Sequence, residues 1–303
     1  MNKNEAIQIS AYIGRIIAEK SPYIEYSVND IDKAYAEYDD DEIDALKKAS
    51  YLDDDFEKFF VIREFCNSTG ISDVSGSYLR RLFMLSKKLD ADKFMQDPYL
   101  SHVKFNDVRR GNIFLTHAEY DRGEILQYDM PEITDSTVVP RLGFFTKKVR
   151  FPALYEGNIP WVSVCPSEIN SMSEQIERAK GRVLVLGLGL GYYPYMISFK
   201  KSVESITIIE LSDNVIDIFN SALLPSFPHK DKITVIHDDA IEYLKTVGID
   251  SFDFCFADIW EGVADGAGFY KQIKSSERRL VNTEFTYWIE KEIKEYIAGA
   301  QDQ

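Results

Sequence analysis

The feature that most constrains the fold is an apolar run followed by three alternate glycines, G-R-V-L-V-L-G-L-G-L-G, over residues 181–191. The unbroken apolar stretch 183–186 is typical of a strand that is buried on both faces. Glycine lets the backbone after such a strand turn sharply and approach a ligand closely. Because glycine-rich turns also occur without a ligand, this stretch by itself does not establish a binding site.

Further strand-like runs follow at 206–209, 233–236 and 252–256, and helical patterns separate them. Strands that alternate with helices of this length predict an α/β fold, a Rossmann-like doubly wound parallel sheet. Towards the end of the chain we expect a helix near 267–280, then a strand around 285–289 and a terminal helix.

Polar residues stand where each of the predicted strands ends. In an open parallel sheet, ligands bind at the carboxyl ends of the strands. A carboxylate after the second strand can accept both hydrogen bonds of a ribose diol, and one after the third can accept an adenine amino hydrogen. Each acid could instead cap the next helix, but four strand ends in register favour a ligand site. The residues are Gly187, Gly189, Gly191, Glu210, Asp238, Asp239 and Asp258.

These motifs, V-L-V-L-G-L-G-L-G, the strand ending at Glu210, I-H-D-D and F-D-F-C-F-A-D, resemble those of class I S-adenosylmethionine-dependent methyltransferases, especially their spermidine-synthase-like branch. The resemblance covers about residues 166–265 and implies S-adenosylmethionine as cofactor. It places Gly187, Gly189 and Gly191 near the amino acid moiety. It places Glu210 on the ribose, Asp239 with Asp238 at the adenine, and Asp258 towards the sulfonium.

Two departures from that branch concern the acceptor site. Aminopropyltransferases carry an Asp-Ser-Ser-Asp-Pro type of loop after the fourth strand, whereas this chain reads D-I-W-E-G from Asp258 to Gly262. The first acid is present, and Glu261 is the only nearby replacement for the second. Because few residues follow Trp260, we also expect the antiparallel strand pair that usually closes a methyltransferase sheet to be absent or much reduced.

Transfer from a sulfonium needs in-line positioning and, for an amine or hydroxyl acceptor, a base. Asp258 is the candidate catalytic base. Trp260, Glu261 and Tyr192 are candidates for the substrate site, and Glu168 is a candidate for the cofactor amino group. The histidines show no metal or triad spacing, and only His237 adjoins the expected adenine edge.

The first half of the chain has a different texture. Amphipathic patterns predict helices over 4–20, 30–49 and 76–89, so we expect a helical N-terminal domain over residues 1–109. Short β-type runs from residue 110 predict a β-hairpin leader over 110–165. The leader opens the S-adenosylmethionine-binding domain, residues 110–303.

Composition limits the partners. The 303 residues carry 35 Lys and Arg against 50 Asp and Glu, a net charge of −15 that disfavours nucleic acid and favours small cations. We therefore expect a small-molecule substrate and favour a cationic one. A homodimer is an open alternative to a monomer. No apolar stretch reaches membrane-span length, so a cytoplasmic protein is expected. The cysteines, Cys66, Cys165 and Cys255, are too far apart for a metal knuckle, and no metal is expected.

The leading functional hypothesis is methyl transfer from S-adenosylmethionine to an unknown acceptor. Aminopropyl transfer from decarboxylated S-adenosylmethionine is a second hypothesis, supported by the acidic charge and the hairpin leader. A nicotinamide-dependent oxidoreductase is a third, although its fingerprint is G-x-G-x-x-G and this chain has G-x-G-x-G. A non-catalytic nucleotide-binding regulator is the fourth.

Overall fold

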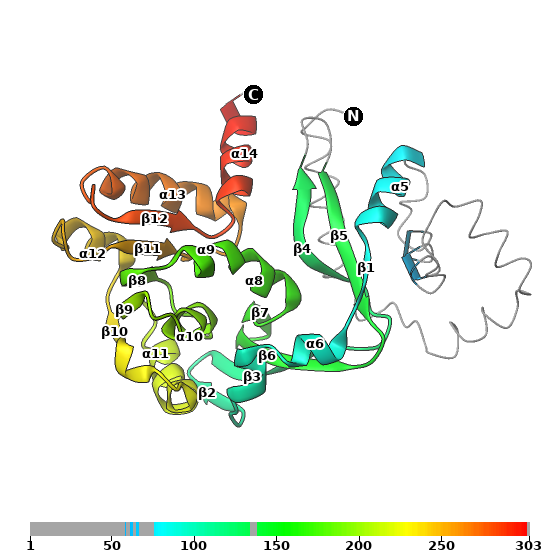
Figure 1. The fold of residues 1–303 in the computed structure, drawn as a ribbon, viewed down its shortest axis with the longest axis horizontal. Helices are drawn as coiled ribbons and strands as arrows, with labels where there is room; N and C mark the ends of the chain where they lie inside the picture. The colour runs from blue at the N-terminus through cyan, green and yellow to red at the C-terminus, as the bar shows by residue number, and fades with distance from the viewer. Residues whose placement is uncertain (1–57, 59–60, 63–64, 67–75, 134–137, 302–303) are drawn as a thin grey trace, which may run out of the picture. The chain divides into compact units, whose positions relative to one another are not determined.

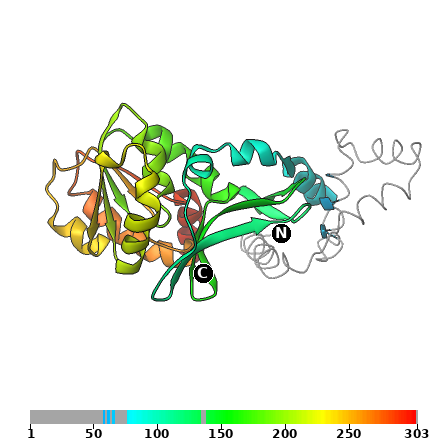
Figure 2. The ribbon, with the colours of Figure 1, turned by 90° about the horizontal axis from the view of Figure 1, so that it is seen from below.

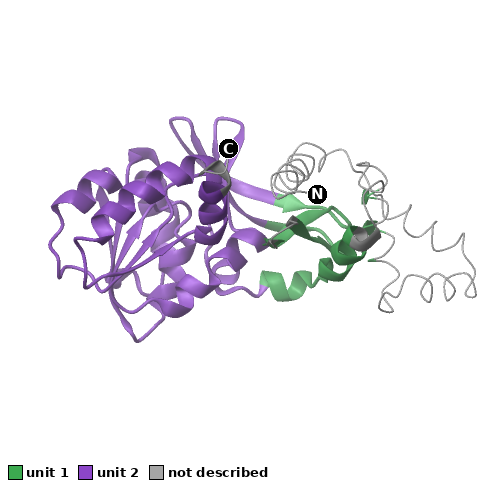
Figure 3. Ribbon diagram, turned by 90° about the horizontal axis from the view of Figure 1, so that it is seen from above, with its two compact units in different colours: residues 1–95, 119–150 green, residues 96–118, 151–303 purple. Residues whose placement is uncertain are grey.

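The structure is a computed structural model that describes residues 58, 61–62, 65–66, 76–133 and 138–301. The chain divides into two compact units (Figure 3), residues 1–95 with 119–150, and residues 96–118 with 151–303. The predicted helices over 4–20 and 30–49 lie outside the described residues. A helix, α5 (Gly76–Leu85), occupies most of the stretch predicted as helical over 76–89.

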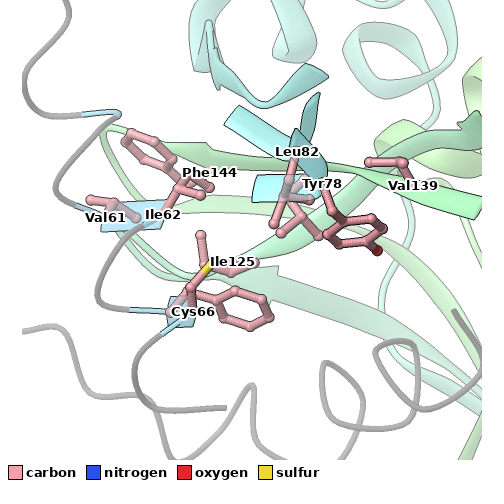
Figure 4. Packing of buried hydrophobic residues seen from close by; sticks show 10 residues of the cluster. Val61, Ile62, Cys66, Tyr78, Leu82, Ile125, Val139 and Phe144 are labelled. Carbon is pink, nitrogen blue, oxygen red and sulfur yellow. The ribbon is translucent and has the colours of Figure 1, made fainter. Parts of the chain in front are cut away.

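The first unit contains a sheet with the strand order β1-β5-β4. β4 and β5 are antiparallel, and β1 pairs with β5 in parallel. Buried side chains from α5, from this sheet and from helical residues near position 62 form an apolar cluster (Figure 4), which includes Phe65, Leu82 and Phe144. The element bounds are β1 (Lys87–Leu89), α6 (Ala91–Met95), β4 (Leu126–Ile133) and β5 (Val138–Phe145).

The second unit begins with a short helix and a sheet with the strand order β2-β3-β6-β7. The bounds are α7 (Pro98–His102), β2 (Val108–Arg110), β3 (Ile113–Tyr120), β6 (Val149–Glu156) and β7 (Ile159–Ser163). Because β3 and β6 each cross a boundary between the units, the predicted leader 110–165 is shared between them. The stretch predicted as a helical domain, 1–109, also contains β1 and β2.

The larger sheet of the second unit has the order β10-β9-β8-β11-β12, and all its pairings are parallel. The protein is therefore an α/β protein with a Rossmann-like doubly wound sheet, as the sequence predicts. In the described part of the chain the sheet ends at β12. The bounds are β8 (Gly181–Leu186), β9 (Val203–Glu210), β10 (Ile233–His237), β11 (Phe254–Ala257) and β12 (Glu284–Tyr287).

Helices connect these parallel strands (Figures 1 and 2). Right-handed connections in this strand order place α10 and α11 on one face of the sheet and α12 and α13 on the other. The bounds are α8 (Pro166–Ser171), α9 (Ser173–Arg178), α10 (Tyr192–Ser198), α11 (Asp213–Ile218), α12 (Ala240–Thr246), α13 (Val263–Glu277) and α14 (Glu290–Gln301). A π-helical turn follows α11 at Phe219–Leu223, and 3-10 turns lie at Leu224–Ser226 and Lys230–Lys232.

The centre of the sheet is fully apolar. Residues 183–186 of β8 are at most 2% exposed, which is why the run has no polar alternation. Because the strands are parallel, their carboxyl ends lie along one edge of the sheet, which places the loops after β8, β9, β10 and β11 together. Among the described residues, no helix combines the length and apolar character needed to cross a lipid bilayer.

The helical segment before β8 and the start of α13 each have a local cause. The segment before β8 breaks at Met172 into α8 and α9, and the N-cap of α8 is Cys165, whose side chain makes no capping hydrogen bond. The Ser167 hydroxyl instead lies 3.1 Å from the Cys165 thiol. α13 begins at Val263, before the predicted position 267, because the Asp265 carboxylate accepts the N–H groups of Glu261 and Gly262 and starts the helix early.

Candidate functional site

A cavity of about 460 Å³ lies at the carboxyl ends of the parallel strands, within the second unit. Its lining comes from the loops after β8, β9, β10 and β11, together with β7, α8 and residue 288. Small-molecule sites in proteins typically have volumes of about 300–1,000 Å³. The cavity is therefore large enough for a nucleoside-sized ligand, and it lies where an open parallel sheet binds its ligands.

The glycine turn after β8 is held by close contacts with protein atoms. Gly187, Gly189 and Gly191 all have left-handed φ angles, of 94°, 51° and 72°. A Cβ on Gly187 would lie 2.0 Å from the Asp258 carbonyl oxygen, and one on Gly191 would lie 2.5 Å from the Phe219 ring. At these two positions the missing side chain thus makes room for neighbouring protein. Gly187 and Gly189 line the cavity, whereas Gly191 lies outside its lining as the N-cap of α10.

Glu210, at the end of β9, connects two of these loops. Its side chain is 7% exposed, and it accepts the Leu188 N–H at 3.0 Å and the Ser212 N–H at 2.8 Å, one on each oxygen. Each carboxylate oxygen has a second lone pair, and Glu210 lines the cavity. The residue can therefore orient the glycine turn and still accept hydrogen bonds from a diol.

Asp258 and Glu168 form the acidic centre of the cavity. Asp258 follows β11, and its main-chain N–H donates to the Leu186 carbonyl at 2.8 Å. Burial raises the pKa of Asp258 well above its usual range, and repulsion from Glu168 raises it further. Burial also raises the pKa of Glu168, to about 7. Glu168 is thus poised to exchange a proton near neutral pH, and Asp258 holds its proton to a higher pH than an ordinary aspartate does.

The two acids after β10 have different environments. Asp239 lines the cavity, and its Oδ1 accepts the N–H groups of Ile241 and Glu242 at 2.8 and 3.0 Å as the cap of α12. The Oδ2 atom of Asp239 accepts neither of these two N–H groups. Asp238 lies outside the cavity lining, exposed, and accepts the Asp239 N–H. His237 also lies outside it and bridges Asp213 and the Leu211 carbonyl.

The loop after β11 supplies the remaining predicted substrate residues, Trp260 and Glu261, and both line the cavity. Trp260 is 7% exposed, and its indole packs against Gly266 of α13. Its buried Nε1 has no hydrogen-bond partner among the described residues. Glu261 is exposed at the rim, and Asp265, which the sequence analysis did not single out, lies beside it as the cap of α13.

Aromatic side chains form much of the wall. The predicted Tyr192 lines the cavity, and its hydroxyl donates to Asp97 at 3.0 Å. Trp161 of β7 and Trp288 also line it, although the sequence analysis did not assign them to the site. The Trp288 indole N–H donates to Ser171 at 2.8 Å, next to Ile289, whose φ of 45° is unusual for a β-branched residue.

The charge of the lining is one-sided. Its carboxylates belong to Glu168, Glu210, Asp239, Asp258, Glu261 and Asp265, and no lysine, arginine or histidine lines it within the described chain. A dinucleotide cofactor would bring a doubly negative pyrophosphate into this field, which is unfavourable without a basic partner. The acceptor carboxylates of the cavity instead suit a ligand with one or more positive charges and a ribose.

Outside this cavity, the described residues give little support for metal binding or for a cysteine nucleophile. Across the residues that the structure describes, no group of three or more His, Cys, Asp or Glu side chains is arranged to hold a metal ion. The side chains of Cys66, Cys165 and Cys255 are buried thiols rather than disulfides, and burial raises the pKa of each. The cysteines are therefore poor nucleophiles, as expected for core residues.

One comparison with known proteins falls on this part of the chain. Residues 167–284 match the family model described as the spermine/spermidine synthase domain. A search among curated proteins finds no match. Among solved structures, the chain is similar to a spermidine synthase from Thermotoga maritima, with 16% identity, a TM-score of 0.32, and coverage of 43% of this chain and 50% of that one.

It is also similar to a protein assigned as an O-methyltransferase from Klebsiella pneumoniae, with 17% identity, a TM-score of 0.28, and coverage of 36% of this chain and 47% of that one. The chain thus spans about half the length of these two proteins. The segment that matches the spermine/spermidine synthase domain runs from the start of α8 to the start of β12 and includes Glu168, the glycine turn, Glu210 and Asp258.

Proposed function

We propose that this protein is a transferase that passes an alkyl group from an S-adenosyl sulfonium donor to an amine acceptor. The observation that carries the proposal is the cavity at the strand ends, which six carboxylates and no basic side chain line in the described part of the chain. A sulfonium and an ammonium are both cations, so the same acidic field favours donor and acceptor.

The charge balance also bears on which donor binds. S-adenosylmethionine carries a carboxylate, and the lining offers it no basic side chain. Decarboxylated S-adenosylmethionine lacks that group and has two positive charges, so it gains more from the carboxylates. Together with the match of residues 167–284 to the spermine/spermidine synthase domain, this makes aminopropyl transfer the function that we put first.

Methyl transfer from S-adenosylmethionine, the leading hypothesis from the sequence, is the second candidate. The observation that favours it lies in the loop after β11. Glu261, at the position of the second acid, is exposed, and the nearby Asp265 is engaged by two main-chain N–H groups as a helix cap. The loop therefore offers fewer carboxylates to hold the distant end of a long polyamine.

The residues that would hold the donor follow from the geometry. Glu210 would accept the ribose hydroxyl hydrogens with its remaining lone pairs, and the oxygen of Asp239 that does not cap α12 would accept from the adenine amino group. When bound, the donor supplies a carbon whose bond to the sulfonium breaks, with the electron pair leaving on sulfur. The positive charge of the sulfonium makes this a good leaving group, so the protein mainly needs to position the reactants.

An amine that arrives as an ammonium ion must lose a proton before its nitrogen can form the new bond. Asp258 is the proposed base, because it lies at the end of β11 in the cavity and its raised pKa makes its carboxylate a stronger proton acceptor. Glu168 is a second proton acceptor beside it, with a pKa near neutrality. A proton taken up by this pair can leave to solvent after the reaction.

The test is product analysis with each donor. The purified chain is incubated with decarboxylated S-adenosylmethionine or S-adenosylmethionine, each with a set of diamines, and the thioether products are separated by chromatography. We expect 5′-methylthioadenosine from the first donor, whereas methyl transfer would give S-adenosylhomocysteine from the second. Binding of neither donor and formation of neither product would refute both candidates and favour a non-catalytic role.

A further inference from the structure

A short helix far from the sheet in sequence holds the glycine turn. Residues before 110 show no motif for the site, yet α7 contacts the loop that follows β8. The Tyr99 hydroxyl donates to the Leu190 carbonyl at 2.6 Å. Leu190 lies between Gly189 and Gly191 and lines the cavity, so this bond reaches the turn itself.

The hydrogen bond from Tyr99 helps to fix the orientation of the peptide unit between Leu190 and Gly191. The carbonyl of Leu190 accepts from Tyr99, and the N–H of the same peptide, on Gly191, donates to the Leu188 carbonyl at 2.9 Å. Glycine-rich turns can rotate such a peptide at low cost because their residues accept both signs of φ. With both polar groups bonded, the plane of this peptide and the path of the turn are fixed.

A second contact from the same helix reaches the cavity wall. Asp97, the N-cap of α7, accepts the N–H groups of Tyr99 and Leu100 with one oxygen and the Tyr192 hydroxyl with the other, at 3.0 Å. Burial and the charge of Asp97 raise the pKa of Tyr192. The phenol is therefore a permanent donor to Asp97, which keeps the Tyr192 ring in one orientation at the cavity.

The packing around these bonds is tight. Tyr99 is fully buried, and the centre of its ring lies 5.6 Å from that of Tyr192, 5.2 Å from that of Tyr195 and 6.1 Å from that of Phe227. The Tyr195 hydroxyl donates to the Pro98 carbonyl at 3.1 Å. Since Tyr195 does not line the cavity, it fastens α7 to α10 without touching the site.

We propose that Asp97 and Tyr99 are positioning residues of the donor site: they set the glycine turn and the Tyr192 wall for the adenosyl ligand. The proposal rests on the proposed function, because it assumes that an S-adenosyl compound binds in this cavity. These two residues thus contribute to the ligand site although they lie more than 80 residues before β8 in the sequence.

The test compares three conservative substitutions in the full chain. Tyr99→Phe removes the bond to the turn, and Asp97→Asn keeps an oxygen for the helix cap but removes the charge that binds Tyr192. Tyr195→Phe is the matched control, since it removes a hydroxyl between the same two helices away from the cavity. Isothermal titration with 5′-methylthioadenosine and S-adenosylhomocysteine gives Kd, and thermal unfolding without ligand gives Tm.

We expect Tyr99→Phe and Asp97→Asn to raise Kd about tenfold, the effect of about one lost hydrogen bond. Tyr195→Phe should lower Tm like Tyr99→Phe but change Kd by less than about twofold. If the first two variants lower Tm and leave Kd unchanged, α7 is only structural and this inference is wrong, while the proposed function stands. If the unaltered chain binds neither nucleoside, both proposals fail together.

Discussion

The buried carboxyl of Glu168 gives a quantitative prediction for stability against pH. Glu168→Gln keeps the shape of the side chain and removes its charge. In the folded protein, burial raises the pKa of Glu168 from an ordinary 4.5 to about 7. The unfolded chain therefore ionises this group at a lower pH than the folded chain does, so the wild-type residue costs stability as the pH rises from 4.5 towards 7.

The size of the effect follows from that difference. At pH 8 both states are ionised, and the full shift is worth about 3 kcal/mol of unfolding free energy, whereas at pH 5 it is worth about 1 kcal/mol. Glutamine removes this cost, so the variant should gain about 2 kcal/mol more over the wild type at pH 8 than at pH 5. Relief of the repulsion with Asp258 adds to the gain in the same direction.

Urea unfolding followed by tryptophan fluorescence measures this directly. All three tryptophans of the chain, Trp161, Trp260 and Trp288, belong to the second unit, so the signal reports the unit that contains Glu168. Glu177→Gln, an exposed change on the neighbouring helix α9, is the control and should show no such pH dependence. Equal gains at pH 5 and pH 8, or a loss at pH 8, would refute the assignment of Glu168 as a buried acid.

Three further substitutions test other parts of the site and its support. Gly187→Ala should cost more than about 3 kcal/mol or prevent folding, because its Cβ would collide with the Asp258 carbonyl; urea unfolding tests this, and a loss below about 1 kcal/mol would contradict it. Lys232→Met should cost about 2–4 kcal/mol in the same assay, because its ammonium donates to the carbonyls of Ser198, Lys200 and Val203; an unchanged midpoint would contradict this. Asp258→Asn should lower the turnover of an identified amine acceptor by about a hundredfold or more while donor Kd stays within about threefold; equal turnover would remove Asp258 as the base.

The parallel sheet could be predicted because its signals are local. Each strand from β8 to β11 contains an apolar run, and a glycine or an acid ends the strand or follows it closely. Burial on both faces removes the polar alternation from the central strands β8 and β11. The same pattern predicts that Glu210, Asp239 and Asp258 lie at one edge of the sheet, and all three line the cavity there. Asp238 and Asp239 could not be separated, because only the turn geometry decides which of two adjacent acids faces the cavity.

The rest of the site depends on contacts that span the chain. Tyr99 bonds to the glycine turn and Asp97 to Tyr192 just after it, each across more than 90 residues, and no periodicity or motif near residue 97 indicates these contacts. Trp161 enters the cavity from β7, and Trp288 enters it from the turn that follows β12. The bounds of β4 within the predicted leader also needed the structure, because its bulged pairing with β5 interrupts the alternation that marks a strand.

Why glycine is needed at each position of the turn becomes clear only from the structure. In the sequence, the three glycines suggest that the backbone must approach a ligand. In the structure, Gly187 and Gly191 are also required for packing, since their missing side chains make room for the main chain of Asp258 and the ring of Phe219. A glycine-rich turn can therefore mark a tightly packed loop as well as a ligand contact.

The central claim is that the acidic cavity binds a cationic adenosyl donor, and calorimetric titration of the purified chain tests it most directly. At equal pH and salt, we predict the tightest binding for decarboxylated S-adenosylmethionine, weaker binding for S-adenosylmethionine, and none for NADH, whose pyrophosphate meets only carboxylates. Binding of NADH, or the absence of binding by both sulfonium compounds, would contradict the account.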